Sequence, residues 1–145
     1  MERAGGARSD RASATGGRLK VRAEGRPTIL LVEDDEDITE VLCLVLSGLG
    51  YDVVTADDGA GALARLRRER EPPRLILLDL MMPGMNGWEF RAEQMRDPRL
   101  RGIPVVVMTG IGDAENEAAA MGVDGLLAKP VDLDELKKSV ARIAS

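Results

Sequence analysis

Short apolar runs that end in polar residues constrain the fold of this chain more than any other feature. Two of them, residues 75–78 and 105–108, are apolar throughout and are followed at once by Asp79 and by Thr109. Strands that are buried on both faces have this uninterrupted character, because neither side of the strand meets water. Weaker runs have the same length and similar ends. We predict strands over about 28–33, 51–55, 74–78, 104–108 and 125–127.

The segments between these runs carry a helical pattern. Residues 36–49 place apolar side chains at intervals of three and four, which is the spacing of one helix face. We predict helices over about 36–49, 60–66, 88–95, 113–121 and 132–144. Because strands and helices alternate strictly, the fold class is α/β, with a parallel sheet covered by helices on both faces.

Carboxylates follow two of the predicted strands. Glu33 and Asp34 end the first run, and Asp79 ends the third. Ligands bind at the carboxyl edge of open α/β sheets, so the three carboxylates would lie close together if their strands are neighbours. A divalent cation would relieve their repulsion, and all-oxygen ligands favour Mg²⁺, Mn²⁺ or Ca²⁺. The alternative is that Glu33 and Asp34 only cap the helix that follows them.

Asp79, Thr109 and Lys129 together suit a phosphoryl group. Asp79 is a candidate metal ligand, and it is also a candidate nucleophile, since carboxylates form acyl phosphates. Lys129 would neutralise phosphoryl oxygens, and the Thr109 hydroxyl would donate to one of them. Pro130 restricts the backbone of Lys129 and permits a cis bond, which would help to aim the lysine inward. Taken alone, Thr109 is an ordinary strand residue and Lys129 a solvated one.

Charge divides the chain near residue 26. Residues 1–26 hold seven basic and three acidic side chains, whereas the whole chain has a net charge of −5. We predict a disordered basic tail over 1–26 and one folded domain over 27–145. An acidic domain argues against direct nucleic-acid binding. No apolar stretch approaches the roughly 20 residues of a membrane span, and no signal peptide is visible, so we expect a cytoplasmic protein.

As a set, these motifs resemble the receiver domain of bacterial two-component response regulators. The resemblance covers about residues 27–144, and the combination is far more specific than any single motif. The matching features are the pair Glu33-Asp34, the segment 79–87 with Met82-Pro83 and Gly87, the strand that ends at Thr109, and Lys129-Pro130.

The resemblance implies a flavodoxin-like (βα)5 fold with strand order 2-1-3-4-5. It implies that Asp79 accepts a phosphoryl group from a histidine kinase or a histidine phosphotransfer protein. Glu33, Asp34 and Asp79 would hold Mg²⁺, or Mn²⁺, together with the backbone carbonyl of Met81. Asp35 would cap the first helix.

The resemblance also implies how the protein gives its output. Thr109 and Lys129 would read the phosphoryl group and shift the face formed by the fourth predicted helix, the fifth strand and the last helix. An effector protein would bind that face. We expect a single-domain response regulator that is not an enzyme, apart from phosphotransfer and slow self-dephosphorylation.

One position departs from the family pattern. Leu126 stands three residues before Lys129, where the family often has an aromatic residue that reorients on activation. This departure keeps open a pseudo-receiver, which is an interaction scaffold that takes no phosphate. A hydrolase resembling the haloacid dehalogenases would need an Asp in place of Met81. A flavodoxin is disfavoured by the scarcity of aromatic residues and the absence of a phosphate-binding loop.

Overall fold

The computed structural model describes residues 25–110 and 121–144. Its strands are β2 (Thr28–Val32), β3 (Asp52–Ala56), β4 (Leu75–Asp79), β5 (Val105–Thr109) and β6 (Gly125–Ala128). Its helices are α2 (Glu36–Gly48), α3 (Gly59–Arg68), α4 (Gly87–Arg96) and α6 (Leu133–Ala144). The predicted tail lies almost wholly outside the described residues, and so does nearly all of the helix predicted over 113–121.

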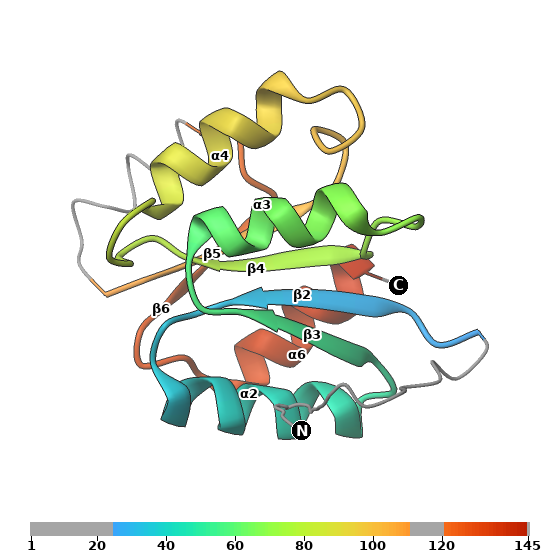
Figure 1. The fold of residues 1–145 in the computed structure, drawn as a ribbon. Helices are drawn as coiled ribbons and strands as arrows, with labels where there is room; N and C mark the ends of the chain where they lie inside the picture. The colour runs from blue at the N-terminus through green and yellow to red at the C-terminus, as the bar shows by residue number, and fades with distance from the viewer. Residues whose placement is uncertain (1–24, 111–120, 145) are drawn as a thin grey trace.

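The strands form one parallel sheet in the order β3-β2-β4-β5-β6. Numbered from the first of the described strands, this is the order 2-1-3-4-5, so the predicted topology is confirmed. Figure 1 shows α3 and α4 on one face of the sheet and α2 and α6 on the other. The sheet is therefore doubly wound, and the strand order reverses between β2 and β4, where such folds place their ligands.

Burial on both faces explains why β4 and β5 are apolar up to their last residues, Asp79 and Thr109. Alternate side chains of β4 enter opposite cores: Ile76 and Leu78 pack with the residues of α3 and α4, and Leu75 and Leu77 pack with those of α2 and α6. Each fully buried aliphatic side chain contributes roughly 1.5–3 kcal/mol. The continuous runs in the sequence are thus the central strands of a three-layer fold.

Two details differ from the sequence prediction. Asp79 and Thr109 are the last residues of β4 and β5, whereas we predicted strands that end one residue earlier. On α2, the three- and four-residue spacing in the sequence places Val41 and Leu49 on the same apolar face as Leu42 and Leu46, yet Val41 and Leu49 are 48% and 41% exposed. The helix packs on the sheet through a narrower stripe that is centred on Leu42 and Leu46.

The described part of the chain has no helix of the length and apolar character that a membrane span requires.

Candidate functional site

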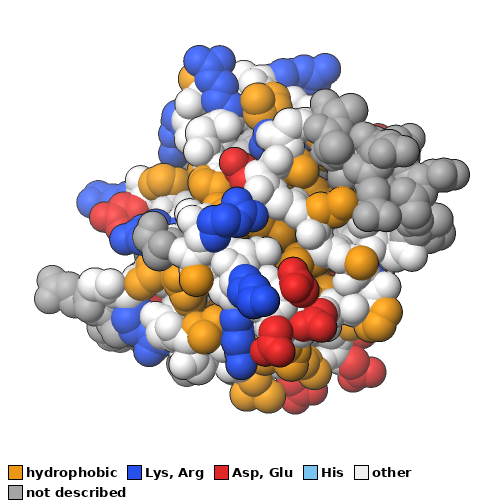
Figure 2. Space-filling view, turned by 180° about the vertical axis from the view of Figure 1, so that it is seen from behind, with side chains coloured by type: hydrophobic (Ala, Val, Ile, Leu, Met, Phe, Trp, Pro, Cys, Tyr) orange, Lys and Arg blue, Asp and Glu red, His pale blue; other side chains and the backbone are white. Residues whose placement is uncertain are grey.

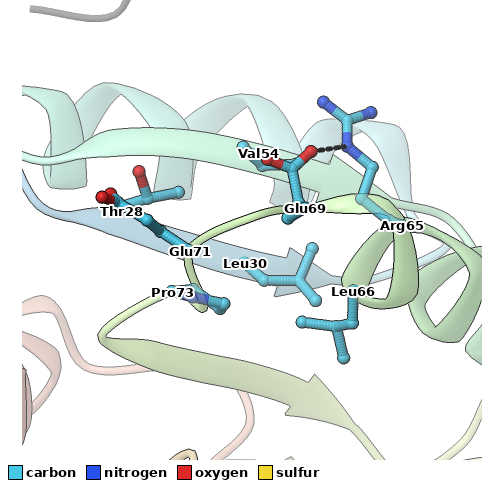
Figure 3. A pocket seen from close by; sticks show the side chains of 8 residues that line it. All are labelled: Thr28, Leu30, Val54, Arg65, Leu66, Glu69, Glu71 and Pro73. Carbon is cyan, nitrogen blue, oxygen red and sulfur yellow. Dashed lines mark ion pairs between the residues drawn. The ribbon is translucent and has the colours of Figure 1, made fainter. Parts of the chain in front are cut away.

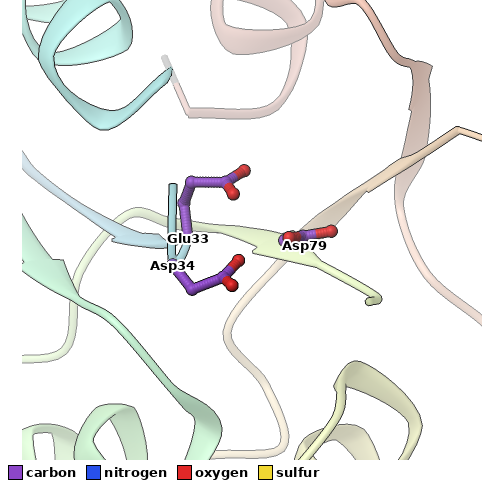
Figure 4. A group of neighbouring side chains, drawn as sticks. All are labelled: Glu33, Asp34 and Asp79. Carbon is purple, nitrogen blue, oxygen red and sulfur yellow. The ribbon is translucent and has the colours of Figure 1, made fainter. Parts of the chain in front are cut away.

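Three carboxylates come together where β2 and β4 end. The register of β2 and β4 pairs Val32 with Leu78. The residues that follow them, Glu33 and Asp79, therefore come side by side. One carboxylate oxygen from each of Glu33, Asp34 and Asp79 lies within 4.8 Å of the others. Figure 4 shows Glu33 and Asp34 extending toward the side on which Asp79 lies. The predicted proximity of the three side chains is confirmed.

Burial distinguishes these carboxylates from ordinary capping acids. Glu33 is 3% and Asp79 is 1% exposed, while Asp34 faces solvent. The cap of α2 is Asp35, whose Oδ1 accepts hydrogen bonds from the backbone N–H groups of Asp37 and Ile38 at 2.9 and 3.2 Å. The predicted role of Asp35 is confirmed. Asp35 therefore provides the capping role that the alternative reading gave to Glu33 and Asp34.

Lys129 completes the charge arrangement. Its Nζ lies 3.1 Å from Glu33 Oε1 and 3.2 Å from Asp79 Oδ2, and its side chain is only 23% exposed. Its backbone N–H donates to the carbonyl of Thr109 at 2.8 Å, which continues the pairing of β5 with β6. The Lys129–Pro130 bond is cis. The interpretation of Lys129 as a solvated surface residue is wrong, because the lysine reaches inward to both buried carboxylates.

Thr109 supplies a hydroxyl at the same edge. The side chain is 2% exposed, and its Oγ1 has no hydrogen-bond partner in the described part of the protein. A buried hydroxyl without a partner is unfavourable by roughly 1–3 kcal/mol. Since Thr109 stands beside Lys129 at the end of neighbouring strands, a bound anion at this edge would be a natural acceptor for its hydrogen.

The ionisation of the site follows from burial and from the neighbouring charges. Burial raises the pKa of Glu33 above its ordinary value of 4.5, and the negative charge of Asp79 raises it further, whereas Lys129 and the Asp35 N–H oppose the change. Burial alone would lower the pKa of Lys129, but Glu33 and Asp79 outweigh burial and raise that pKa above 10.5. Lys129 is therefore cationic near neutral pH.

The chain beyond β4 folds back tightly onto the site. The N–H of Met81 donates to Asp79 Oδ1 at 3.1 Å, and the Met81 side chain is 62% exposed. Gly87 begins α4, and a Cβ atom there would lie 2.7 Å from the Cα of Leu80. The backbone of Met81 thus lies beside the carboxylate, and the role of its carbonyl oxygen as a metal ligand stays a prediction.

Leu126 and Trp88 both contribute to the core on the side of the sheet that α3 and α4 cover. Both are half-buried and pack against the apolar cluster beneath α3 and α4. Trp88 is therefore in part a core residue. Leu126 offers no aromatic ring next to Lys129, so any activation of this chain would have to proceed without the aromatic reorientation expected from the family.

Sequence reasoning missed a group of buried polar side chains away from the carboxylates. Arg91 and Gln94 on α4 are 7% and 0% exposed. Their burial could have been inferred from their spacing, because Arg91 and Gln94 follow Gly87 at intervals of four and three residues and so share its helix face. Charged and amide side chains ordinarily indicate a solvent-facing surface, which hid that pattern.

The surface carries a group of acidic side chains on one face (Figure 2) and a small pocket away from the carboxylate cluster. In the space-filling view from behind, several Asp and Glu side chains gather low on the visible face, with Lys or Arg side chains beside them (Figure 2). A small pocket lies near the start of β2, between Thr28, Leu66 and Pro73, and an Arg65–Glu69 ion pair of 3.7 Å spans its rim (Figure 3). Thr28 begins β2, whereas Glu33 follows its end. The pocket therefore lies at the amino ends of the strands, away from the carboxylate cluster at their carboxyl ends.

The fold and the site define an α/β domain with a carboxylate cluster and a lysine at its switch point. Residues 29–141 match the family described as the response regulator receiver domain. The chain belongs to this family, and the resemblance stated from the sequence is confirmed.

Curated relatives and solved structures agree with this assignment. The chain is 41% identical over 118 residues to the phosphate regulon transcriptional regulatory protein PhoB of Escherichia coli, covering 79% of this chain and 49% of PhoB. It is 38% identical over 120 residues to the DNA-binding response regulator MtrA of Mycobacterium tuberculosis, covering 81% of this chain and 49% of MtrA. The chain thus spans about half the length of these relatives.

Two solved structures show the same fold. A putative response regulator from Chloroflexus aurantiacus has a TM-score of 0.77 at 30% identity, covering 82% of this chain and 98% of that chain. The chemotaxis response regulator CheY4 of Vibrio cholerae has a TM-score of 0.74 at 30% identity, covering 81% of this chain and 98% of that chain. The flavodoxin-like fold expected from the sequence is confirmed.

Proposed function

We propose that Asp79 is the phosphoacceptor of a two-component signalling protein. The observation that carries this proposal is the convergence of one cation and three carboxylates: Lys129 Nζ is 3.2 Å from Asp79 Oδ2, in contact with the Glu33–Asp34–Asp79 cluster. A buried carboxylate with a lysine at one oxygen and an unpartnered hydroxyl nearby suits the capture of a phosphoryl group.

In the proposed reaction, a carboxylate oxygen of Asp79 attacks the phosphorus of a phosphohistidine. A bond forms between that oxygen and phosphorus, and the bond between phosphorus and the imidazole nitrogen breaks, so that the imidazole nitrogen takes the electron pair and is protonated from solvent water. Lys129 would neutralise one phosphoryl oxygen, and Thr109 would donate a hydrogen bond to another. Positioning and charge neutralisation of this kind supply most of the catalysis in phosphoryl transfer.

The carboxylate cluster fits a hard divalent cation. Glu33, Asp34 and Asp79 offer oxygen ligands within 4.8 Å of one another, and one of the three carboxylates faces solvent, where waters can complete the coordination. Mg²⁺ characteristically takes one or two carboxylates, waters and a phosphate oxygen. We propose Mg²⁺ as the ion, with Mn²⁺ as a substitute and with the Met81 carbonyl as a further ligand. The ion would screen the charge between Asp79 and the incoming phosphoryl group.

Phosphorylation would be read out on the surface of β6 and α6. Thr109 and Lys129 stand at the ends of adjacent strands, so drawing both toward a phosphoryl group would move the edge of the sheet that carries α6. A partner that prefers the phosphorylated arrangement would then bind there. We propose a stoichiometric phosphoacceptor that works in the cytoplasm with a histidine kinase or a histidine phosphotransfer protein, rather than a turnover enzyme.

The expectation of a protein that consists of this domain alone remains a prediction. The names of MtrA and PhoB describe DNA-binding or transcriptional regulators, and each is about twice the length that matches here. We propose that this domain acts through partner binding, with no direct contact to nucleic acid. A gel-shift assay with the phosphorylated chain would reveal nucleic-acid binding, which would contradict that part of the proposal.

Incorporation of phosphate from acetyl phosphate, followed by intact mass, tests the phosphoacceptor assignment. We expect one phosphate on the wild-type chain in the presence of Mg²⁺, none with EDTA, and none on Asp79→Asn. Asp57→Asn is the matched control, because Asp57 is an exposed carboxylate in the turn after β3, and it should accept phosphate at the wild-type rate. Phosphate on Asp79→Asn at the wild-type level would refute the assignment. No phosphate on any variant, with a cognate kinase as well, would favour the pseudo-receiver.

A further inference from the structure

The inward face of α4 carries a polar pair that the phosphoacceptor site does not use. Arg91 and Gln94 lie one helical turn apart, and both are buried, as is Phe90 on the same helix. Burial of a guanidinium and an amide is unfavourable unless their hydrogen bonds are satisfied. Their partners therefore show what the pair holds together.

Arg91 ties α4 to the turn that precedes β6. Its Nε donates to the carbonyl of Met121 at 3.3 Å, and its Nη2 donates to the carbonyl of Gly122 at 3.0 Å. Its Nη1 donates to Gln94 Oε1 at 2.7 Å. Arginine can hold two adjacent carbonyls in one orientation, because its donors form a rigid planar fork.

Gln94 extends the same contacts to the loop that precedes β5. Its Nε2 donates to the carbonyls of Leu100 and Ile103 at 2.9 and 3.1 Å, so both amide hydrogens and the amide oxygen are used. α4 thereby fixes the approaches to two neighbouring strands. A fully satisfied buried network of this kind specifies one arrangement of the backbone.

Asp124 joins the two approaches. Its carboxylate accepts a hydrogen bond from the N–H of Val105 at 2.9 Å, and its own N–H donates to the carbonyl of Val105 at 2.8 Å. Its charge also acts favourably on the guanidinium of Arg91. The entrance of β6 is therefore held twice, by β5 through Asp124 and by α4 through Arg91.

The far end of β6 carries Lys129. β6 is an edge strand, with four residues and pairing on one side only, so its ladder gives it little support of its own. We propose that Arg91 is a positioning residue for Lys129: by fixing the 121–122 turn to α4, it sets the placement of β6 and thereby the placement of the lysine beside Asp79. This inference rests on the proposed function only for its consequence in phosphoryl transfer, because the placement itself is measurable without phosphate.

Amide hydrogen exchange of Arg91→Met tests the placement directly. Methionine keeps much of the volume and removes the three hydrogen bonds. The amides of Asp124 and Lys129, which donate to Val105 and Thr109, should exchange about tenfold faster or more, while the amide of Ile76 in β4 keeps most of its protection. Arg96→Met is the matched control, since Arg96 is an exposed residue of the same helix that pairs with Glu93. It should change neither group of amides.

The rate of phosphorylation provides a second test of the positioning role of Arg91. Arg91→Met should slow incorporation from acetyl phosphate about tenfold through misplacement of Lys129, and it should have no further effect in a Lys129→Ala background, because the two residues then act on one step. An equal slowing in both backgrounds would overturn the inference, and so would a uniform loss of protection across the sheet.

Two further outcomes are distinguishable. If Arg91→Met does not fold, Asp124→Ala takes its place, because Asp124 is exposed and its substitution removes the side-chain hydrogen bond that helps to hold the same turn to β5. Unchanged exchange at Lys129 in Asp124→Ala would then overturn the inference. If no variant accepts phosphate while Lys129 loses protection in Arg91→Met, the proposed function fails and the positioning role stands.

Discussion

The properties of the carboxylates and of Lys129 at the site depend on how close they lie to one another. Glu33 lies beside Asp79 because their strands pair in register, and Lys129 reaches both because β6 ends at the same edge. Each residue alone has an ordinary interpretation. Their mutual distances make the repulsion and the neutralisation unavoidable, and they predict that the site binds cations in a pH-dependent way.

Mg²⁺ affinity should fall as the pH is lowered through the raised pKa of Glu33. The ion needs the ionised carboxylate, and the pKa of Glu33 lies above 4.5 through burial and the charge of Asp79. Below that pKa each pH unit should weaken binding by about tenfold, with one additional proton released per ion bound. The ion-free domain should change in the opposite sense: because the folded pKa is raised, the contribution of Glu33 to stability is present at low pH and is lost as the pH rises through that pKa.

Titration calorimetry with Mg²⁺ from pH 7 down to pH 4.5, the ordinary value above which the pKa of Glu33 is raised, measures this effect. Glu33→Gln should bind more weakly and lose the additional proton release, whereas Glu40→Gln, on the exposed side of α2, should behave as the wild type does. An affinity of the wild type that is independent of pH over this range would contradict the role of Glu33 as a ligand.

Among the elements, α4 links the loop after Asp79 to the approaches to β5 and β6. It begins at Gly87, against the backbone of Leu80, and its capping box is complete, with Asn86 Oδ1 accepting from the N–H of Glu89 at 2.9 Å and Glu89 Oε1 accepting from the N–H of Asn86 at 2.9 Å. Its other end holds the approaches to β5 and β6. The start of the helix is thus tied to the loop after Asp79, and the rest of it to the strands that carry Thr109 and Lys129.

Gly87→Ala should destabilise the domain by about 1–3 kcal/mol, because its Cβ would lie 2.7 Å from the Cα and Cδ2 of Leu80, and the backbone would have to shift. Gly48→Ala is the control at a helical glycine with open space around it. There the substitution should be neutral or stabilising by up to about 1 kcal/mol, since alanine is the better helix former. Urea denaturation measures both, and equal effects would mean that the close approach at Gly87 is unimportant.

Across the whole molecule, the proposed function requires two arrangements that differ by only a few kcal/mol. Lys129 and Thr109 link the site to β6 and, beyond it, to α6. Lys129 is the one lysine of the described part that lies at the site, since Lys137 and Lys138 are exposed on α6. Loss of Lys129 should therefore impair the conformational response to phosphate more than it impairs metal binding.

Lys129→Ala should retain Mg²⁺ binding and lose most of the conformational response to phosphate. The carboxylates remain in place, but no cation draws β6 toward the phosphoryl oxygens. Hydrogen exchange of β6 and α6, with and without phosphate on Asp79, measures the response. Lys137→Ala, at an exposed position of α6, provides the control. A full response in Lys129→Ala would show that the lysine takes no part in the switch.

Local chemistry determined much of this protein in advance. Continuous apolar runs of four residues favour strands covered on both faces, and their alternation with helices favours a doubly wound parallel sheet, so the fold class could be predicted. The strand order and the cap at Asp35 were predicted from the family resemblance. The candidate site residues were also predictable, since Glu33, Asp34, Asp79 and Thr109 all stand at strand ends.

Tertiary structure decided what depends on contacts between distant segments. It placed Lys129 between Glu33 and Asp79, left the Thr109 hydroxyl without a partner and confined the packing of α2 to a narrow stripe. It also buried Arg91 and Gln94, whose polarity indicates solvent in any reading of the sequence. The reason is that burial and pKa depend on which segments pack together, whereas periodicity and capping depend on residues only a few positions apart.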